Sequence, residues 1–285
     1  MSRLLTDEIV QPDIEEYLSD YADFSFELRV LKELNDLGLH CKHSGTYDDP
    51  LTGKSREFDI RALLDKHPIR FHLSVECKNI QNHYPLVMHC LKRSLNESYN
   101  DLIHTFEPPP KKVGGFTLAG PDILKEFCKS LRVEGEKSLY KESHYVAKSS
   151  DQVGRHINGT ITASDGGVFE KISQAINSAK DLIYEAYSLD TKGGKSYVTF
   201  VCPVLVVPDS VLWQVNYSDD GAMDGSPNQV NHVSYYIGKE WTIGNRLHPL
   251  SLTLSHLEII TFSQIKTLIE NYFGGYRIFS KGKST

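Results

Sequence analysis

The chain has 285 residues, of which 40% are hydrophobic and 24% are charged, with a formal net charge of −6. This composition is that of an ordinary globular protein, and no run of about 18 apolar residues is present that would span a membrane. The acidic charge counts against nucleic-acid binding, because freestanding DNA-binding domains are usually basic. A basic groove can still coexist with an acidic remainder of the chain, or a partner subunit can supply many of the contacts to nucleic acid.

The cysteines and the N-terminus indicate a location inside the cell. The cysteine count is odd and no C-x-x-C pair occurs, so neither a zinc knuckle nor a disulfide framework is expected; the five are Cys41, Cys77, Cys90, Cys128 and Cys202. Met1–Glu8 lacks the long apolar core of a signal peptide. We therefore expect a cytoplasmic protein with no membrane association. The length allows one large domain or two small ones, and we expect a single domain over residues 1–285.

Two helices are expected at the start of the chain. Asp13–Asp23 is acidic and predicts a short helix. A second helix should begin at about Ser25 and stop at Gly38, because apolar residues recur at helical spacing: Phe26, Val30, Leu31, Leu34 and Leu37. Glu27 falls in its first turn, where the helix dipole favours an acid that is merely solvated.

Three strands should follow, over Leu39–Tyr47, Ser55–Leu64 and Ile69–Lys78. Alternating apolar residues indicate strands, and turn-forming residues occupy the gaps at 48–54 and 65–68. Asp59 on the second strand and Glu76 on the third are 17 positions apart, which allows them to lie side by side in a hairpin. Neighbouring carboxylates repel, and a hard divalent cation such as Mg²⁺ would relieve the repulsion.

The third strand ends in Glu76-Cys77-Lys78. Side chains two apart on a strand point the same way, so Glu76 and Lys78 should share one face. A plain ion pair at a strand end is one interpretation and a chemical site is another. Glu57 lies two residues before Asp59 and is the alternative acid if the strand is shifted by one pleat.

An aspartate followed by Glu-x-Lys on the next strand resembles the PD-(D/E)XK nuclease superfamily. The resemblance is discontinuous, runs from Phe24 to about Pro208, and departs from the family pattern at Phe58, where a proline is expected. It implies an α/β fold with a restriction-endonuclease-like core, a central mixed β-sheet flanked by helices. That core would comprise about 24–78 and 168–208, with a long insertion at 79–167 and a β-rich C-terminal extension at 209–285.

The resemblance also implies site roles. Asp59 and Glu76 would ligate Mg²⁺ or Mn²⁺ together with the Cys77 carbonyl, and Lys78 would position the attacking water. Glu27 would join the site as a helix-borne acid. The implied function is a metal-dependent endonuclease that hydrolyses phosphodiester bonds, with DNA favoured as substrate. By analogy, the setting would be bacterial restriction or antiviral defence, with a regulatory protein partner or a homo-oligomer.

The insertion is less clearly patterned. We expect a strand at Pro85–Cys90, helices at Ser94–Thr105 and Ile123–Leu131, and a short strand at Tyr145–Ser150 that leaves into a loop through Arg155. The segment from Tyr145 to Arg155 contains hydrogen-bond donors suited to phosphate oxygens, and the candidates are Lys148, Ser149 and Arg155. The alternative is that these polar residues are merely solvated in a loop.

A convincing helix spans Glu170–Tyr187, where the small residues Ala175 and Ala179 would let it lie close to a sheet. Gln174 lies at the edge of its apolar stripe; the resemblance gives such a residue a nucleic-acid-binding role, and a surface glutamine is the alternative. Tyr197–Pro208 predicts a strand buried on both faces. Beyond it we expect a polar loop, a final helix from Ser263 to Gly274, and strands at Val211–Tyr217, His232–Ile237 and Leu252–Thr261.

The second functional class is a non-catalytic α/β binding module in which the same charged residues form a structural ion cluster. The acidic net charge and the long insertion favour it. Metal binding separates the two classes, because a structural cluster should not need Mg²⁺.

Overall fold

The computed structural model describes residues 7–49, 53–105, 111–113, 116–118, 128–164, 166–188, 196–243 and 250–274. The helices are α1 (Gln11–Asp20), α2 (Phe24–Asp36), α3 (Gly166–Ser188) and α4 (Ile265–Gly274), with short 3₁₀ turns at Leu95–Glu97, Gly135–Lys137 and Phe262–Gln264. The strands are β1 (His40–Asp48), β2 (Ser55–Lys66), β3 (Ile69–Cys77), β4 (Leu86–Lys92), β5 (Tyr99–Thr105), β6 (Lys111–Val113), β7 (Phe116–Leu118), β8 (Cys128–Glu134), β9 (Tyr145–Arg155), β10 (Ile161–Ser164), β11 (Tyr197–Val207), β12 (Leu212–Asn216), β13 (Asn228–Gln229), β14 (His232–Ile243) and β15 (Leu250–Thr261).

Thirteen of these strands form one mixed sheet, so the expected α/β class with a central mixed sheet is confirmed. Its main path runs β1-β2-β3-β11-β15-β14-β9-β4-β12-β13, while β5 pairs with β11 and β8, and β10 pairs with β9. β2 is antiparallel to both β1 and β3, and β11 lies parallel to its two neighbours β3 and β15. In the part of the chain described, no helix is long and apolar enough to cross a membrane.

The first half of the core follows the sequence pattern closely. α2 and the three strands lie where the periodicity predicts them, and Gly38 ends the helical segment with a positive φ of 84° that suits glycine. The strand predictions at 211–217 and 252–261 and the final helix are also confirmed, while β14 extends to Ile243.

β11 separates two apolar layers. Its side chains alternate, so that Val204 and Val206 pack with α2 and α4 on one face, whereas Leu205 and Val207 pack on the face that α3 covers. The predicted strand with two buried faces is therefore confirmed, and each buried aliphatic side chain stabilises the fold by roughly 1.5–3 kcal/mol.

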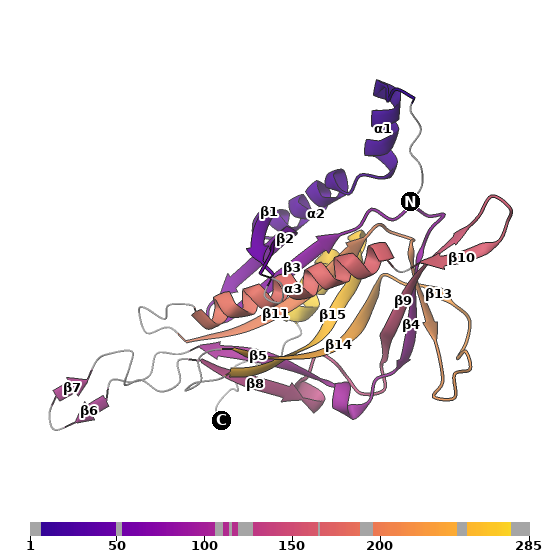
Figure 1. The fold of residues 1–285 in the computed structure, drawn as a ribbon. Coiled ribbons are helices and arrows are strands. Elements are labelled where there is room, and N and C mark those ends of the chain that lie inside the picture. The colour runs from indigo at the N-terminus through magenta and orange to yellow at the C-terminus, as the bar shows by residue number, and fades with distance from the viewer. Residues whose placement is uncertain are drawn as a thin grey trace.

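α3 crosses the sheet over β3 and β11, as Figure 1 shows. Ala175 and Ala179 are fully buried, and the Ser74 hydroxyl donates to the Ala175 carbonyl at 3.0 Å, which confirms the close approach of helix and sheet. Farther along, Arg61 of β2 donates to Ser178 and pairs with Asp181 at 2.8 Å. A row of polar contacts thus fixes α3 over the same face of β3 that carries Ser74 and Glu76.

The helix predicted at Ser94–Thr105 is wrong. A 3₁₀ turn at Leu95–Glu97 leads into β5, whose residues Tyr99 to Ile103 are all buried between β8 and β11. The helix predicted at Ile123–Leu131 is wrong from Cys128 onward, where β8 begins, and its earlier part lies outside the described residues. Both segments form strands because they pair with strands that are distant in the sequence. The local spacing of apolar residues gives no information about such pairing.

The loop predicted through Arg155 is also wrong, because β9 continues unbroken from Tyr145 to Arg155. Its backbone pairs with β4 and then with β10, so the polar residues lie on a strand. Residues 79–167 thereby contribute β4, β5, β8, β9 and β10 to the main sheet, and the polar segment 218–229 ends in the short strand β13.

We expect Arg61→Ala to lower the free energy of unfolding by about 1.5–3 kcal/mol, because it removes charge-assisted hydrogen bonds between the sheet and α3. Lys32→Ala is the matched control, since it removes an exposed pair with Asp36 within α2 and should leave stability unchanged. Urea denaturation of both variants measures the difference; equal midpoints would show that the Arg61 contacts do not hold α3.

Candidate active site

Asp59 and Glu76 lie beside each other on β2 and β3, as the hairpin argument predicts. The register pairs Ile60 with Val75, which places the two acids opposite one another, and the Asp59 N–H lies 3.5 Å from Glu76 Oε1. Glu57 is exposed on β2, so Asp59 is the acid that faces Glu76. Asp59 Oδ2 also accepts the Cys77 N–H at 2.8 Å, which fixes its carboxylate across the strand pair.

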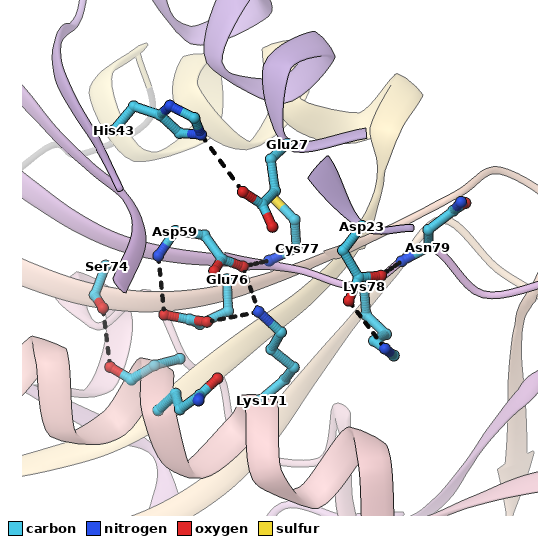
Figure 2. Close-up of polar contacts among 12 residues, drawn as sticks. Asp23, Glu27, His43, Asp59, Ser74, Glu76, Cys77, Lys78, Asn79 and Lys171 are labelled. Carbon is cyan, nitrogen blue, oxygen red and sulfur yellow. Dashed lines mark hydrogen bonds and ion pairs between the residues drawn. The ribbon is translucent and has the colours of Figure 1, made fainter. Parts of the chain in front are cut away.

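The cation that bridges these carboxylates is Lys171, from the second turn of α3. Its Nζ lies 2.7 Å from Asp59 Oδ2 and 3.2 Å from Glu76 Oε2 (Figure 2). The Glu76 side chain is only 1% exposed and that of Lys171 is 16% exposed, so the contact is largely screened from water. The repulsion that the sequence predicts between the two acids is thus offset by an ammonium group of this chain.

Glu27 is a third acid of the cluster. It projects from the first turn of α2 toward Asp59 and Cys77 in Figure 2, and its Oε2 lies 3.4 Å from His43 Nε2. Burial raises the pKa of Glu27, and the Asp59 charge raises it further. Of the two interpretations open from the sequence, the position of Glu27 favours a site residue over a solvated acid.

The cluster contains more acid than its one ammonium can neutralise. Burial, followed by the Asp59 charge, raises the pKa of Glu76 to about 8. Burial alone would lower the pKa of Lys171, but Glu76 and Asp59 together raise it above its ordinary value. Lys171 therefore stays charged, the raised pKa of Glu76 favours its protonated form, and an added cation would favour the ionised form.

Lys78 lies at the rim of this cluster. β3 ends at Cys77, and the Lys78 ammonium pairs with Asp23 at 3.0 Å, while Asp23 also accepts the Asn79 N–H at 2.7 Å. The ion pair suggested between Glu76 and Lys78 is replaced by two separate pairs, Glu76 with Lys171 and Lys78 with Asp23 (Figure 2).

Sequence reasoning missed Lys171, although a signal was present. Ala175 and Ala179 were recognised as facing the sheet, and Lys171 lies four residues before Ala175 on the same helical face. Extending the stripe by one turn toward the N-terminus reaches Lys171. Asp23 had no comparable signal, because its contact depends on how the turn before α2 meets the end of β3.

The residues present are chemically suited to a magnesium ion. Within the described segments no three His, Cys, Asp or Glu side chains form a group that could hold a metal. Mg²⁺ does not need such a cage, because proteins usually hold it through one or two carboxylates, with water and substrate phosphates completing the coordination. Asp59 and Glu76 would supply that pair of oxygen ligands to a bound ion.

The four residues predicted to bind nucleic acid do not form one surface. Lys148 pairs with Glu97, and Ser149 pairs in the ladder with His89 of β4. Gln174 is half-buried on α3, where its main-chain carbonyl accepts from Tyr47 and its side-chain Oε1 is buried with no partner. Arg155 is exposed at the end of β9 and donates to the Gly159 carbonyl.

Comparison with protein-family models, curated proteins and solved structures gives no match to this chain.

We expect the Glu76 carboxyl to contribute a loss of stability to the metal-free protein as the pH rises from about 4.5 to about 8. The folded-state pKa of Glu76 lies above its ordinary value of 4.5, so the folded chain binds more protons in this window. Buried His72 and His256, whose pKa values are lowered, act in the opposite direction, so the contribution of Glu76 is the difference between wild type and Glu76→Gln. That difference should change over the window, whereas the matched change Glu57→Gln, at an exposed position of β2, should follow the wild type. Melting temperatures against pH in a chelating buffer measure this; a constant difference between wild type and Glu76→Gln would contradict it.

Proposed function

We propose that this protein is a metal-dependent endonuclease, a phosphodiesterase that hydrolyses nucleic acid, with DNA the favoured substrate. The observation that carries the proposal is the excess of acidic side chains over ammonium groups beside the end of β3. Three acids, Glu27, Asp59 and Glu76, gather around the ammonium of Lys171 in a largely buried position. Ionising all three acids is costly without a further cation, which raises the pKa values of Glu27 and Glu76, and a divalent ion would remove that cost.

In this proposal Asp59 and Glu76 hold Mg²⁺ or Mn²⁺. Once bound, the ion would polarise the scissile phosphate and lower the pKa of the attacking water. The resemblance gives the Cys77 carbonyl a place in the same ligand set, and Cys77 is fully buried directly after Glu76.

Lys171 takes the role that the resemblance assigns to Lys78. An ammonium fixed by two carboxylates is already oriented toward the place where charge develops on the phosphate, and it needs no reorganisation during the reaction. Glu27, held near His43, is placed to exchange a proton with water at the same position. Lys78, paired with Asp23 at the rim, would contact the substrate rather than the reacting phosphorus.

The arrangement of elements supports a restriction-endonuclease-like core. α2 is followed by three antiparallel strands, and α3 leads into β11, which lies parallel to β3. A role in bacterial restriction or antiviral defence, control by a partner protein and a cytoplasmic location rest on the resemblance alone.

A non-catalytic binding module is the second candidate, and one observation favours it. Lys171 donates to both carboxylates, so the Asp59–Glu76 pair already has a cation from the chain. In this reading the cluster fixes α3 to the sheet and needs no metal.

The test combines cleavage and stability on the same preparations. DNA and RNA, single- and double-stranded, are incubated with the wild type in Mg²⁺, Mn²⁺ or chelator. We expect metal-dependent cleavage that falls by about 100-fold or more in Asp59→Asn, Glu76→Gln and Lys171→Ala, because each change removes a ligand or the charge beside the phosphate. Lys78→Ala is the matched control and should lose far less catalytic rate than Lys171→Ala.

Stability separates the two candidates. Lys171→Ala leaves the acids without their ammonium. It should lower the free energy of unfolding by about 3–5 kcal/mol, because it removes one partner of a buried ion pair. For a nuclease, Mg²⁺ should restore part of that loss. A wild type inactive with every metal and substrate, together with a Lys171→Ala loss that Mg²⁺ does not change, would favour the binding module.

A further inference from the structure

A pocket of about 380 Å³ opens beside the acidic cluster. Its wall includes the end of β3, the segment before β4, the end of β9 and the turn after α1. Six lining residues matter here, which are Tyr21, Lys78, His83, Tyr84, Arg155 and His156. None of the residues lining the pocket is an aspartate or a glutamate, although the chain as a whole carries a net charge of −6.

The charge of this pocket complements an anion. Lys78 and Arg155 contribute cationic side chains to the wall, and His83 and His156 line it as well. Asp23 pairs with Lys78 at 3.0 Å, which fixes the position of the ammonium. Phosphate groups of a nucleic acid are the anions that such lysine and arginine side chains bind.

The aromatic part of the wall is rigidly built. A Cβ placed on Gly154 would lie 2.5 Å from Cδ2 of the Tyr84 ring, so the ring lies directly on the backbone of β9 and only glycine allows it. Tyr21, which is 58% exposed, presents a second ring at the turn after α1. Flat rings at a positively charged wall are the usual platform on which unpaired bases stack.

The pocket adjoins the acidic cluster at two places in the fold, which are the end of β3 and the first turn of α3. Lys78 follows the Glu76–Cys77 segment directly, and it lines the pocket. At the other side, a Cβ placed on Gly167 would lie 3.7 Å from Oε1 of Gln152, another lining residue. Lys171 lies four residues beyond Gly167, which is about 6 Å along the axis of α3.

We propose that this pocket receives one unpaired nucleotide of a single-stranded nucleic acid, and that an adjoining phosphate then reaches the acidic cluster. This inference rests on the proposed function. The base stacks on Tyr84 and Tyr21, while Lys78 and Arg155 hold the phosphates. A volume of about 380 Å³ lies at the small end of ligand pockets, so it accommodates a single nucleotide and excludes a paired duplex.

The experiment measures binding separately from cleavage. A short fluorescent oligothymidylate is titrated, in chelating buffer, into full-length protein carrying Glu76→Gln, and anisotropy gives the affinity. We expect Tyr84→Ala and Arg155→Ala each to weaken binding by about 10-fold, because each removes a stacking or phosphate contact. Tyr84→Phe keeps the ring and should bind normally, and a blunt duplex should compete poorly.

Two further measurements make the test specific. Gly154→Ala adds a methyl group that displaces the Tyr84 ring without removing any polar group, so it should weaken binding as Tyr84→Ala does. Arg155→Ala should also make the plot of log affinity against log salt less steep by about 0.7, the value for one lost phosphate contact on a single strand. Tyr184→Ala on α3 and Lys42→Ala on β1 are the matched controls and should leave affinity unchanged.

The outcomes distinguish this inference from the proposed function. Metal-dependent cleavage by the wild type, with unchanged affinity in the Tyr84 and Arg155 variants, would overturn the pocket assignment and leave the nuclease standing. Oligonucleotide binding that depends on Tyr84 and Arg155, without cleavage in any metal, would support the pocket and overturn the nuclease. A protein that binds no single strand, or binds the duplex more tightly, overturns the pocket assignment.

Discussion

The contact on which the rest of the structure depends is the Lys171 ammonium between Asp59 and Glu76. It requires two placements, because β2 and β3 must pair in one register and α3 must cross them at close range. Ala175 permits that approach, and the hydrogen bond from Ser74 fixes it. The helix, the register and the charge cluster are therefore mutually dependent, and a shift in any one of them would leave buried charge unpaired.

This dependence explains how one arrangement supports two functional readings. A buried group of three acids and one lysine is an inefficient way to hold a helix on a sheet, since apolar packing of similar volume is often as stable. The apolar layers around β11 already supply such packing on both faces. Retaining an under-neutralised cluster in that setting is more readily understood as preparation for a cation and an anionic substrate than as a structural device.

The sequence predicted the part of the site that local pattern encodes. Alternation and turn residues place Asp59 beside Glu76, and helical spacing places Glu27 at the start of α2. Lys171 lay within reach of the same argument, one turn before Ala175. The strand predicted at Tyr145–Ser150 is confirmed as the first part of β9. β5 and the end of β9 were misassigned because the polar or mixed composition of Tyr99–Thr105 and Asp151–Arg155 is compatible with a strand only when distant partners satisfy the backbone. The pairing of Lys78 with Asp23 likewise depends on tertiary geometry.

α1 projects away from the sheet in Figure 1, and most of its apolar side chains are exposed, including Ile14, Tyr17 and Leu18. The turn that follows it is not independent of the site: Tyr21 lines the pocket, and Asp23 holds both Lys78 and the Asn79 backbone. Tyr21 is the C-cap residue of α1, whereas Asp23 is the N-cap residue of α2, so the two belong to different helices. A rotation of α1 about this turn would therefore move the Tyr21 ring at the pocket wall, and it need not break the pair between Lys78 and Asp23.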